Sequence, residues 1–317
     1  MIVTVTLNAA IDRTLTVPNF QRGRRHRASA GVTLAGGKGI NVARALKSLG
    51  VPVVATGLVG GATGSRIVEA LTREAILNDF VHIEGESRTS TAVVDSTGGT
   101  YTEINEWGPA VTGGELDTLL EKLCYLTQDA ALVVFAGSLP RDVDDGFYAE
   151  AARELAKRHV STVLDTEGEP LRLGVEAEPF LVSPNQTEAE GLVGQEFHDE
   201  EDFRLALDGI ADLGARNVLI TTEHGAVALL REERDVHHFQ ARAPRVDAVS
   251  VVGAGDVLLA GFLAARHAGR SNAEALRAAV AAGAASTLEV GAGKFDPRHA
   301  GRLQAGVELS ELAPVEA

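Results

Sequence analysis

Short apolar runs alternate along the chain with segments whose apolar residues recur every three or four positions. The runs are rich in Val and Ile and end near glycine or proline, which indicates buried strands, whereas the other spacing indicates amphipathic helices. Strands are predicted at residues 2–7, 53–58, 131–136, 162–164, 180–182 and 218–221, and helices at 40–49, 114–126, 147–158, 202–213, 255–267 and 272–289. This alternation predicts an α/β fold with a mainly parallel sheet covered by helices.

Residues 12–34 and 88–106 interrupt this rhythm, because polar and apolar residues alternate singly there. Single alternation is typical of half-buried antiparallel strands, and the small residues Ser96-Thr97-Gly98-Gly99 suit a hairpin turn. We expect the two segments to form one small sheet, a lid inserted into a single domain that spans residues 1–317. An unpaired sheet edge is a template for another chain, so we expect a homodimer through this lid.

The composition adds a large core and an acidic surface. The chain has 317 residues, of which 45% are hydrophobic, and its 44 acidic against 29 basic residues give a net charge of −15. Only five of the basic residues are lysine. Such a surface argues against a nucleic-acid partner and is typical of proteins in concentrated salt, where the screening length falls to about 3 Å near 1 M. We therefore hypothesise a salt-rich cell.

Two further features concern the protein's location and its cysteine content. No apolar run is long enough to span a bilayer, and no basic segment precedes the first apolar run, so we expect a cytoplasmic protein without a membrane partner. The single cysteine, Cys124, excludes an internal disulfide framework.

The most informative segment is residues 251–262, where one acid directly follows a run of small residues at a predicted helix start. The first N–H groups of a helix are unpaired and carry partial positive charge, so the backbone of Gly253, Ala254 and Gly255 could bind a phosphate. Asp256 then stands where a general base could accept a hydroxyl proton. A glycine-rich helix cap explains the motif equally well. The apolar residues through Val252 predict a strand, or its end, before the helix.

Residues 35–46 contain a second glycine-rich helix start around Lys38. No Ser or Thr follows Lys38, and Val32 stands where a P-loop has glycine. Val42 replaces the last glycine of a dinucleotide fingerprint, which disfavours an NAD-dependent oxidoreductase. Once these two motifs are excluded, the glycines around Lys38 still leave the backbone there accessible to a ligand. Asn41 could then reach a sugar hydroxyl. A tight turn before a buried helix is the alternative.

A third segment places Asn185 and Glu188 one helical turn apart, just after a predicted strand. Oxygen ligands at that spacing suit a hydrated Mg²⁺ ion, which needs few protein ligands. A helix cap explains the Asn-x-x-Glu pattern nearly as well.

Taken together, these segments resemble the ribokinase-like, PfkB-type carbohydrate kinases. Residues 35–46 and 249–262 resemble the two signature regions of that family, in the expected order, and residues 185–188 resemble its Asn-x-x-Glu magnesium motif. The resemblance implies a three-layer α/β/α core with a small β lid, ATP as phosphoryl donor, and Mg²⁺. It also implies roles for individual residues: Asp256 as the base, Gly253 to Gly255 around the migrating phosphoryl group, Asn185 and Glu188 at the metal, Thr221 and Gly225 beside ATP, and Asp12, Gly37 and Asn41 at the sugar.

Four details resemble the branch of this family that acts on phosphorylated hexoses. Residues 6–12 resemble its opening Thr-Leu-Asn-Pro-Ala-x-Asp, with Ala9 in place of proline, and residues 102–109 resemble its Asn-Glu-x-Gly-Pro segment. Lys38 lies inside the first signature, and Ser250 stands where kinases of unphosphorylated sugars commonly have Asp. The implied substrate is fructose 1-phosphate. Its own phosphate would be bound by Lys38, Arg88 and the loop that contains Ser138.

One departure concerns Ser183, since this branch usually has lysine there. A bound K⁺ ion is one hypothetical replacement for the missing charge. Tagatose-6-phosphate kinase and 6-phosphofructokinase activities of the same family remain alternatives. The missing lysine also leaves open a catalytically silent sugar-phosphate sensor.

Overall fold

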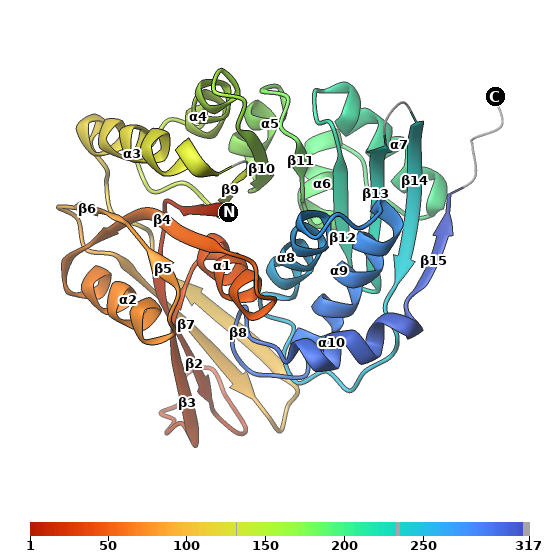
Figure 1. Ribbon diagram of the computed structural model, residues 1–317. Coiled ribbons are helices and arrows are strands. Elements are labelled where there is room, and N and C mark those ends of the chain that lie inside the picture. Colours follow the sequence, from red (N-terminus) through yellow and green to blue (C-terminus); the bar gives the residue numbers. More distant parts are fainter. Residues whose placement is uncertain (131, 233–234, 313–317) are drawn as a thin grey trace.

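A computed structural model describes residues 1–130, 132–232 and 235–312. It shows an α/β protein with one large sheet and one small sheet (Figure 1). The strands of the large sheet run in the order β15-β14-β13-β12-β11-β10-β9-β1-β4-β5, with β6 also paired to β4. Their bounds are β1 (Ile2–Thr6), β4 (Val53–Gly60), β5 (Leu77–Asn78), β6 (Val81–Ile83), β9 (Leu132–Ala136), β10 (Ser161–Asp165), β11 (Leu181–Val182), β12 (Val218–Thr222), β13 (Gly225–Glu232), β14 (Asp235–Arg242) and β15 (Glu308–Glu311).

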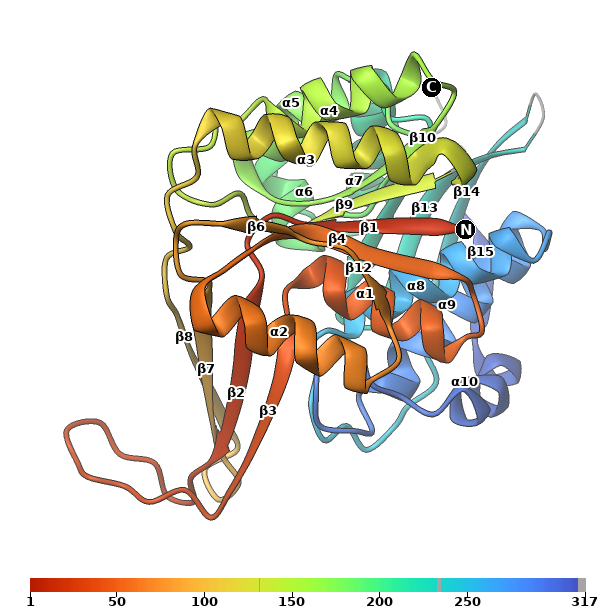
Figure 2. The same ribbon diagram turned by 60° about the vertical axis from the view of Figure 1, so that its left-hand side comes forward.

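Helices cover both faces of the large sheet, which confirms the predicted three layers (Figure 2). On one face lie α1 (Lys38–Ser48), α2 (Gly61–Arg73), α8 (Ala254–His267), α9 (Asn272–Ser286) and α10 (Pro297–Leu303). On the other lie α3 (Gly113–Leu126), α4 (Phe147–Ala156), α5 (Gly168–Val175), α6 (Gln186–Val193) and α7 (Glu200–Asp212). In β9, Val133 and Phe135 pack on one side while Val134 and Ala136 pack on the other. Strands buried on both faces therefore appear in the sequence as continuous apolar runs.

The small sheet is built from two separate segments of the chain, in the strand order β3-β2-β7-β8. Its strands are β2 (Ala10–Thr16), β3 (Ala30–Gly36), β7 (Arg88–Asp95) and β8 (Thr100–Asn105). The predicted turn at residues 96–99 joins β7 to β8, and Asp95 pairs with Thr100. β3 ends at Gly36, one residue before the N-cap of α1, so this lid leads directly into the first glycine-rich segment.

The structure differs from the predicted elements in two regions. The predicted strand before residue 253 is wrong: Val249, Val251 and Val252 lie outside strands and are exposed. Their segment folds against the end of α9, where the N–H groups of Val249 and Ser250 both donate to the carbonyl of Thr287. The antiparallel strands β13 and β14 and the helix α2 were not predicted. The predicted strand 131–136 begins at a residue outside the described ones, and its described part is β9.

No helix in the described ranges combines the length and the apolar character that crossing a membrane requires.

Candidate active site

A cleft of about 760 Å³ opens where the lid meets the carboxyl ends of the parallel strands. Its walls include residues that directly follow or end β1, β9, β10, β11 and β12, namely Asn8, Gly137, Ser138, Asp165, Ser183, Asn185 and Thr221. The chain continues from β1 to β4 on one side, whereas β9 lies on the other side of β1. Open α/β sheets bind ligands at such a switch point, outside the carboxyl ends of their strands.

The start of α8 forms one wall of this cleft and contains the predicted phosphate-binding glycines. Gly253 is the N-cap with φ 76°, and a Cβ there would lie 2.8 Å from the Cβ of Ala292, so only glycine fits. Ala254 donates its N–H to Val251, whereas within the described part of the chain the N–H groups of Gly253 and Gly255 have no partner. Two unpaired amides, rather than the three expected, are therefore available to an anion.

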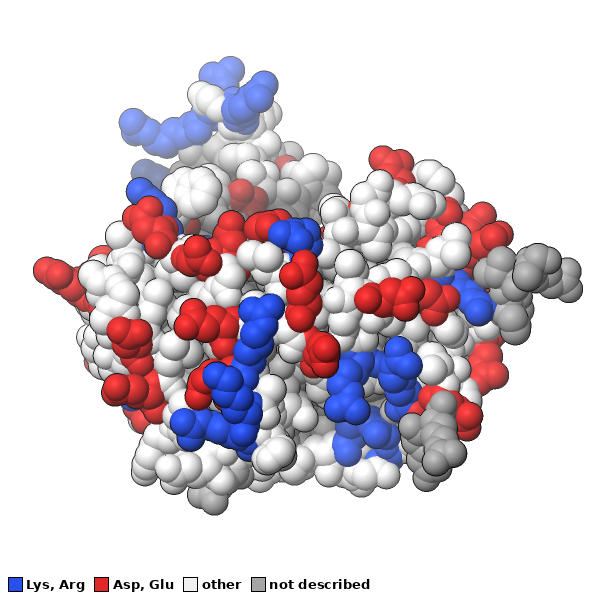
Figure 3. Space-filling view, turned by 90° about the horizontal axis from the view of Figure 1, so that it is seen from above, with Lys and Arg blue, Asp and Glu red and all other residues white. Residues whose placement is uncertain are grey.

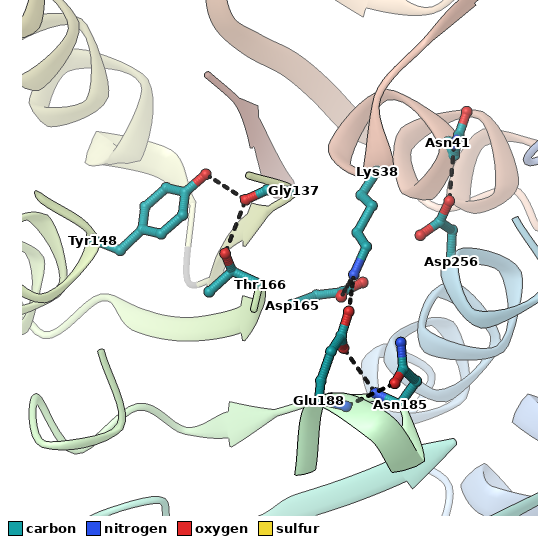
Figure 4. A network of polar contacts seen from close by, with 9 residues as sticks. All are labelled: Lys38, Asn41, Gly137, Tyr148, Asp165, Thr166, Asn185, Glu188 and Asp256. Carbon is teal, nitrogen blue, oxygen red and sulfur yellow. Dashed lines mark hydrogen bonds and ion pairs between the residues drawn. The ribbon is translucent and has the colours of Figure 1, made fainter. Parts of the chain in front are cut away.

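Asp256 lies in the first turn of α8 and is held by a chain of polar side chains. The Nδ2 group of Asn41 donates to Asp256 Oδ2 at 2.8 Å (Figure 4). The Oδ1 atom of Asn41 accepts from Arg44 Nη1 at 3.1 Å, and Arg44 also donates to the carbonyls of Ala35 and Ala292. Because Arg44 can only donate, it determines which end of the Asn41 amide faces Asp256. The predicted sugar-binding amide is thus engaged with the predicted base.

The environment of Asp256 suits a general base near neutral pH. Burial raises the pKa of Asp256 to about 7, with a further increase from the nearby Asp165 carboxylate. Lys38 and the hydrogen bond from Asn41 act in the opposite direction and lower this pKa. A buried acid with a perturbed pKa in a cleft is characteristic of functional sites, because a catalytic pKa close to the working pH is favoured.

Lys38, the first residue of α1, bridges two carboxylates in the cleft (Figure 4). Its Nζ atom lies 2.8 Å from Asp165 Oδ1 and 3.0 Å from Glu188 Oε1. Burial alone would lower the pKa of Lys38, but Asp165 and Glu188 raise it well above the ordinary value, so the ammonium stays charged. Asp165 was missed in the sequence analysis, although an acid at the carboxyl end of a predicted strand was a signal that could have found it.

Asn185 and Glu188 form the helix cap that was the alternative interpretation of their spacing. Asn185 Oδ1 accepts from the N–H of Glu188 at 2.9 Å, and Glu188 Oε2 accepts from the N–H of Asn185 at 2.8 Å. The described residues contain no cluster of three or more His, Cys, Asp or Glu side chains suited to a metal. The pair Asp165 and Glu188 nevertheless fits a hydrated Mg²⁺, which binds through one or two carboxylates. The ammonium of Lys38 shows that this pair accepts a cation.

The lid contributes Asp12 from β2 and Arg88 from β7 to the cleft. Burial raises the pKa of Asp12 to about 6, while Arg88 lowers it and Glu103 raises it further. A Cβ at Gly36 would lie 1.9 Å from Asp12 Oδ2, so glycine is required for the carboxylate to lie against β3. Arg88 Nε donates to the carbonyl of Asn8 at 3.2 Å, which ties the lid to the end of β1.

The loop after β9 carries Ser138, whose Oγ accepts from Asn8 Nδ2 at 3.2 Å. Gly137 adopts φ 99°, and its carbonyl accepts from the Tyr148 hydroxyl and from Thr166 Oγ1, each at 3.0 Å (Figure 4). Burial raises the pKa of Tyr148, so its hydroxyl keeps its proton and remains a donor. Tyr148 and Thr166 hold this loop in place. No local sequence pattern pointed to either residue.

Of the remaining candidate binding residues, three line the cleft and one lies in the large sheet outside it. Gly37 (φ 110°), Ser183 and Thr221 line the cleft, and Thr221 N–H donates to the carbonyl of Pro184 at 3.0 Å. Gly225 lies outside the cleft lining, and a Cβ there would lie 2.1 Å from the carbonyl oxygen of Ala241 in β14. The close packing of β13 against β14 therefore explains why residue 225 is a glycine.

The fold, the lid and a helix start with a buried acid define a ribokinase-like kinase. Residues 2–298 match the pfkB family carbohydrate kinase model, and the chain belongs to this family, whose kinases use ATP with Mg²⁺. This confirms the predicted family and enzyme class.

Three similar proteins illustrate the relationship. A 1-phosphofructokinase of Borreliella burgdorferi is 33% identical over 289 residues, covering 91% of this chain and 92% of that protein. Phosphofructokinase-2 from Escherichia coli in complex with substrates and products has a TM-score of 0.89 at 29% identity, covering 96% of this chain and 98% of the other. The same enzyme in complex with potassium has a TM-score of 0.88 at 28% identity, with the same two coverages.

Proposed function

We propose that this carbohydrate kinase transfers the γ-phosphoryl group of ATP to the free primary hydroxyl of fructose 1-phosphate, giving fructose 1,6-bisphosphate and ADP. The observation that carries the proposal is the position of Asp256, a buried acid with a pKa of about 7 at the start of α8, in a cleft that also contains Arg88 and Lys38. The similarity to a protein named 1-phosphofructokinase supports this substrate.

Asp256 is proposed to accept the proton of the attacking hydroxyl. The hydroxyl oxygen bonds to the γ-phosphorus, the bond to the β–γ bridging oxygen breaks, and ADP leaves. Phosphoryl transfer depends mainly on positioning and on stabilising the charge of the migrating group. We propose that the unpaired N–H groups of Gly253 and Gly255 bind that group, because α8 begins with the positive end of its dipole in the cleft.

Two carboxylates are proposed to hold the metal of the family. Asp165 and Glu188 would bind Mg²⁺, which neutralises phosphate oxygens when bound. The turn at Asn185 orients Glu188 for this role. Lys38 lies between these carboxylates, and its charge also lowers the pKa of Asp256. We propose that its long, flexible side chain binds phosphate oxygens at the point where sugar and nucleotide meet.

The two ends of the cleft are assigned to the two substrates. On the lid side, Asp12 and the backbone at Gly37 are proposed to bind sugar hydroxyls, with Arg88 and Ser138 at the phosphate of the sugar. Arginine presents a fork of donors that matches phosphate oxygens. On the other side, Thr221 is proposed to contact ATP. Gly225, paired with Thr222 in the β12–β13 hairpin, is proposed to border the nucleotide.

A coupled ADP-release assay with fructose 1-phosphate, fructose 6-phosphate, tagatose 6-phosphate and free fructose tests the proposal. We expect the highest kcat/KM with fructose 1-phosphate. A higher value with either 6-phosphate would reassign the substrate within the family. Absence of ADP with all four sugars would favour the silent sensor.

The role of Asp256 is tested by Asp256→Asn. We expect kcat to fall by at least about 100-fold, the lower range for removing a general base, while ATP binding is retained. Asp117→Asn, which changes an exposed acid on α3, is the matched control and should leave kcat unchanged. Near-normal turnover by Asp256→Asn would contradict the assignment.

Two further proposals concern ions. Ser183 provides no positive charge at the nucleotide end, so we propose that K⁺ contributes it; equal activity in KCl and NaCl would refute this. The excess of acidic residues supports function in concentrated salt, and Figure 3 shows acidic side chains spread over one face with basic ones between them. Full folding and activity without salt, with loss of both on adding salt, would refute that proposal.

We also propose a homodimer through the lid. All residues of β8 are exposed, including Tyr101 and Ile104, so this strand presents an uncovered edge and face. Light scattering should give twice the chain mass for the wild type and the chain mass for Ile104→Asp. A monomeric wild type would refute the dimer.

A further inference from the structure

Trp107 is the single tryptophan of the chain, and its environment is unusual. It is 82% exposed, yet it is one of the residues that line the cleft. It lies in the connection between β8 of the lid and α3 of the core, which Figure 2 shows rising along one edge of the molecule. Tryptophan side chains supply large apolar contact areas when a partner covers them, and ligand pockets are commonly lined by aromatic side chains.

The exposure of Trp107 does not come from a loosely held loop, because the backbone on both sides of it is fixed. Before it, the N–H of Glu106 donates to the carbonyl of Thr89, and Thr89 N–H donates to Glu106 Oε2 at 2.8 Å. After it, Gly108 packs so tightly that a Cβ would lie 2.2 Å from Asn8 Oδ1. Pro109 packs against Gly85. The indole is therefore presented to the cleft from an anchored backbone.

The contacts of this segment place Trp107 at the lid end of the cleft. Ala110 forms a β-bridge with Arg141, so the segment runs beside the loop that carries Ser138. Asn8, against which Gly108 packs, accepts from Arg88 through its carbonyl and donates to Ser138 through its side chain. These are the residues proposed for the sugar phosphate, whereas the nucleotide residues follow β11 and β12.

We propose that the indole of Trp107 stacks on the sugar part of the bound sugar phosphate and covers it from water, so that Trp107 is a binding and specificity-determining residue of this kinase. The inference rests on the proposed function, since it requires a sugar phosphate at the lid end. The C–H face of a sugar is apolar and its phosphate is anionic, so an aromatic face next to Arg88 complements both parts. Covering this end also keeps water from competing with the sugar hydroxyl for ATP.

The single tryptophan makes a direct binding test available without any labelling. We expect the emission of the wild-type protein to shift to shorter wavelength, and acrylamide quenching to decrease, on titration with fructose 1-phosphate. Inorganic phosphate at the same concentrations should produce neither change, because it lacks the sugar. Unchanged emission and quenching at a saturating concentration of the sugar phosphate that the ADP-release assay identifies as the substrate would overturn the proposal. Strong protection from acrylamide before any ligand is added would also overturn it, because a second subunit would then cover the indole.

Variants separate stacking from a general effect on folding. Trp107→Ala should raise KM for the sugar phosphate about tenfold, within the range expected for losing an aromatic contact, and leave KM for ATP unchanged. Trp107→Phe should restore most of the affinity. Tyr125→Ala, which removes an exposed aromatic residue of α3 outside the cleft, is the matched control and should change neither KM. Equal KM values for Trp107→Ala and the wild type would refute the role.

The outcomes distinguish this inference from the proposed function. If ADP is released from fructose 1-phosphate but the fluorescence does not respond to it, the inference fails and the function stands. If another sugar phosphate is the substrate and its titration protects Trp107, the substrate assignment fails and the inference stands.

Discussion

The hydrogen bond from Asn41 to Asp256 yields the sharpest test of the proposed base. Asn41→Leu keeps a side chain of similar size but removes the donor at 2.8 Å from Asp256 Oδ2. Because this donor lowers the pKa of Asp256, its loss should raise that pKa above about 7. Only the ionised carboxylate can accept a proton, so the variant should lose activity at neutral pH and regain it at alkaline pH.

The size of the effect follows from the strength of the bond. A hydrogen bond to a charged group contributes about 1.5–3 kcal/mol, and a change of one in pKa corresponds to about 1.4 kcal/mol, so the pKa of Asp256 should rise by about 1 to 2. At pH 7 the ionised fraction would fall from about a half to between about a tenth and a hundredth, which predicts a loss of about 5-fold to 50-fold in kcat/KM.

The assay is the pH profile of kcat/KM between pH 5 and pH 10, which reports the ionisation of the free enzyme. The control is Asn272→Leu, which removes another buried amide that donates to the carbonyl of Arg231, away from the cleft. It should leave the acidic limb in its wild-type position. If the acidic limbs of Asn41→Leu and the wild type coincide, then Asp256 is not the titrating base or Asn41 does not tune it.

Three further predictions follow from the same geometry. Asp165→Asn removes an anion that raises the pKa of Asp256. The acidic limb of the pH profile of kcat/KM should therefore move to lower pH, in the opposite direction to Asn41→Leu. An unmoved limb would contradict the electrostatic argument. Gly36→Ala places a methyl group against the Asp12 carboxylate. KM for the sugar phosphate should therefore rise at least about tenfold, while KM for ATP stays unchanged. Equal changes in both KM values would point to general misfolding. Tyr148→Phe removes one of the two donors to the carbonyl of Gly137 and leaves Thr166 as the other. The free energy of unfolding, measured with denaturant, should fall by about 0.5–1.5 kcal/mol, and a wild-type value would refute the role of that bond.

Several elements could be predicted because their causes are local. The buried strands β1, β4, β9 and β10 appear as apolar runs, and α8 begins at its glycine-rich start as expected. The lid strands could be recognised from their single alternation. In contrast, Val249, Val251 and Val252 have the composition of a strand but lie exposed beside the end of α9. Apolar residues are more stable when buried, but the sequence of a segment does not show whether other elements will pack over it. Here the segment is hydrogen-bonded to the end of α9, and the three valines stay exposed.

The candidate site shows the same division. The sequence by itself determined the glycine-rich helix starts and the cap formed by Asn185 and Glu188, because sterics and hydrogen bonds within a few residues govern such features. Only the tertiary structure decided that Asn41 faces Asp256, which lies 215 positions away, and that Lys38 bridges Glu188 and the unforeseen Asp165. The physical reason is that strand order, which no local pattern encodes, brings the carboxyl ends of distant strands to one edge of the sheet.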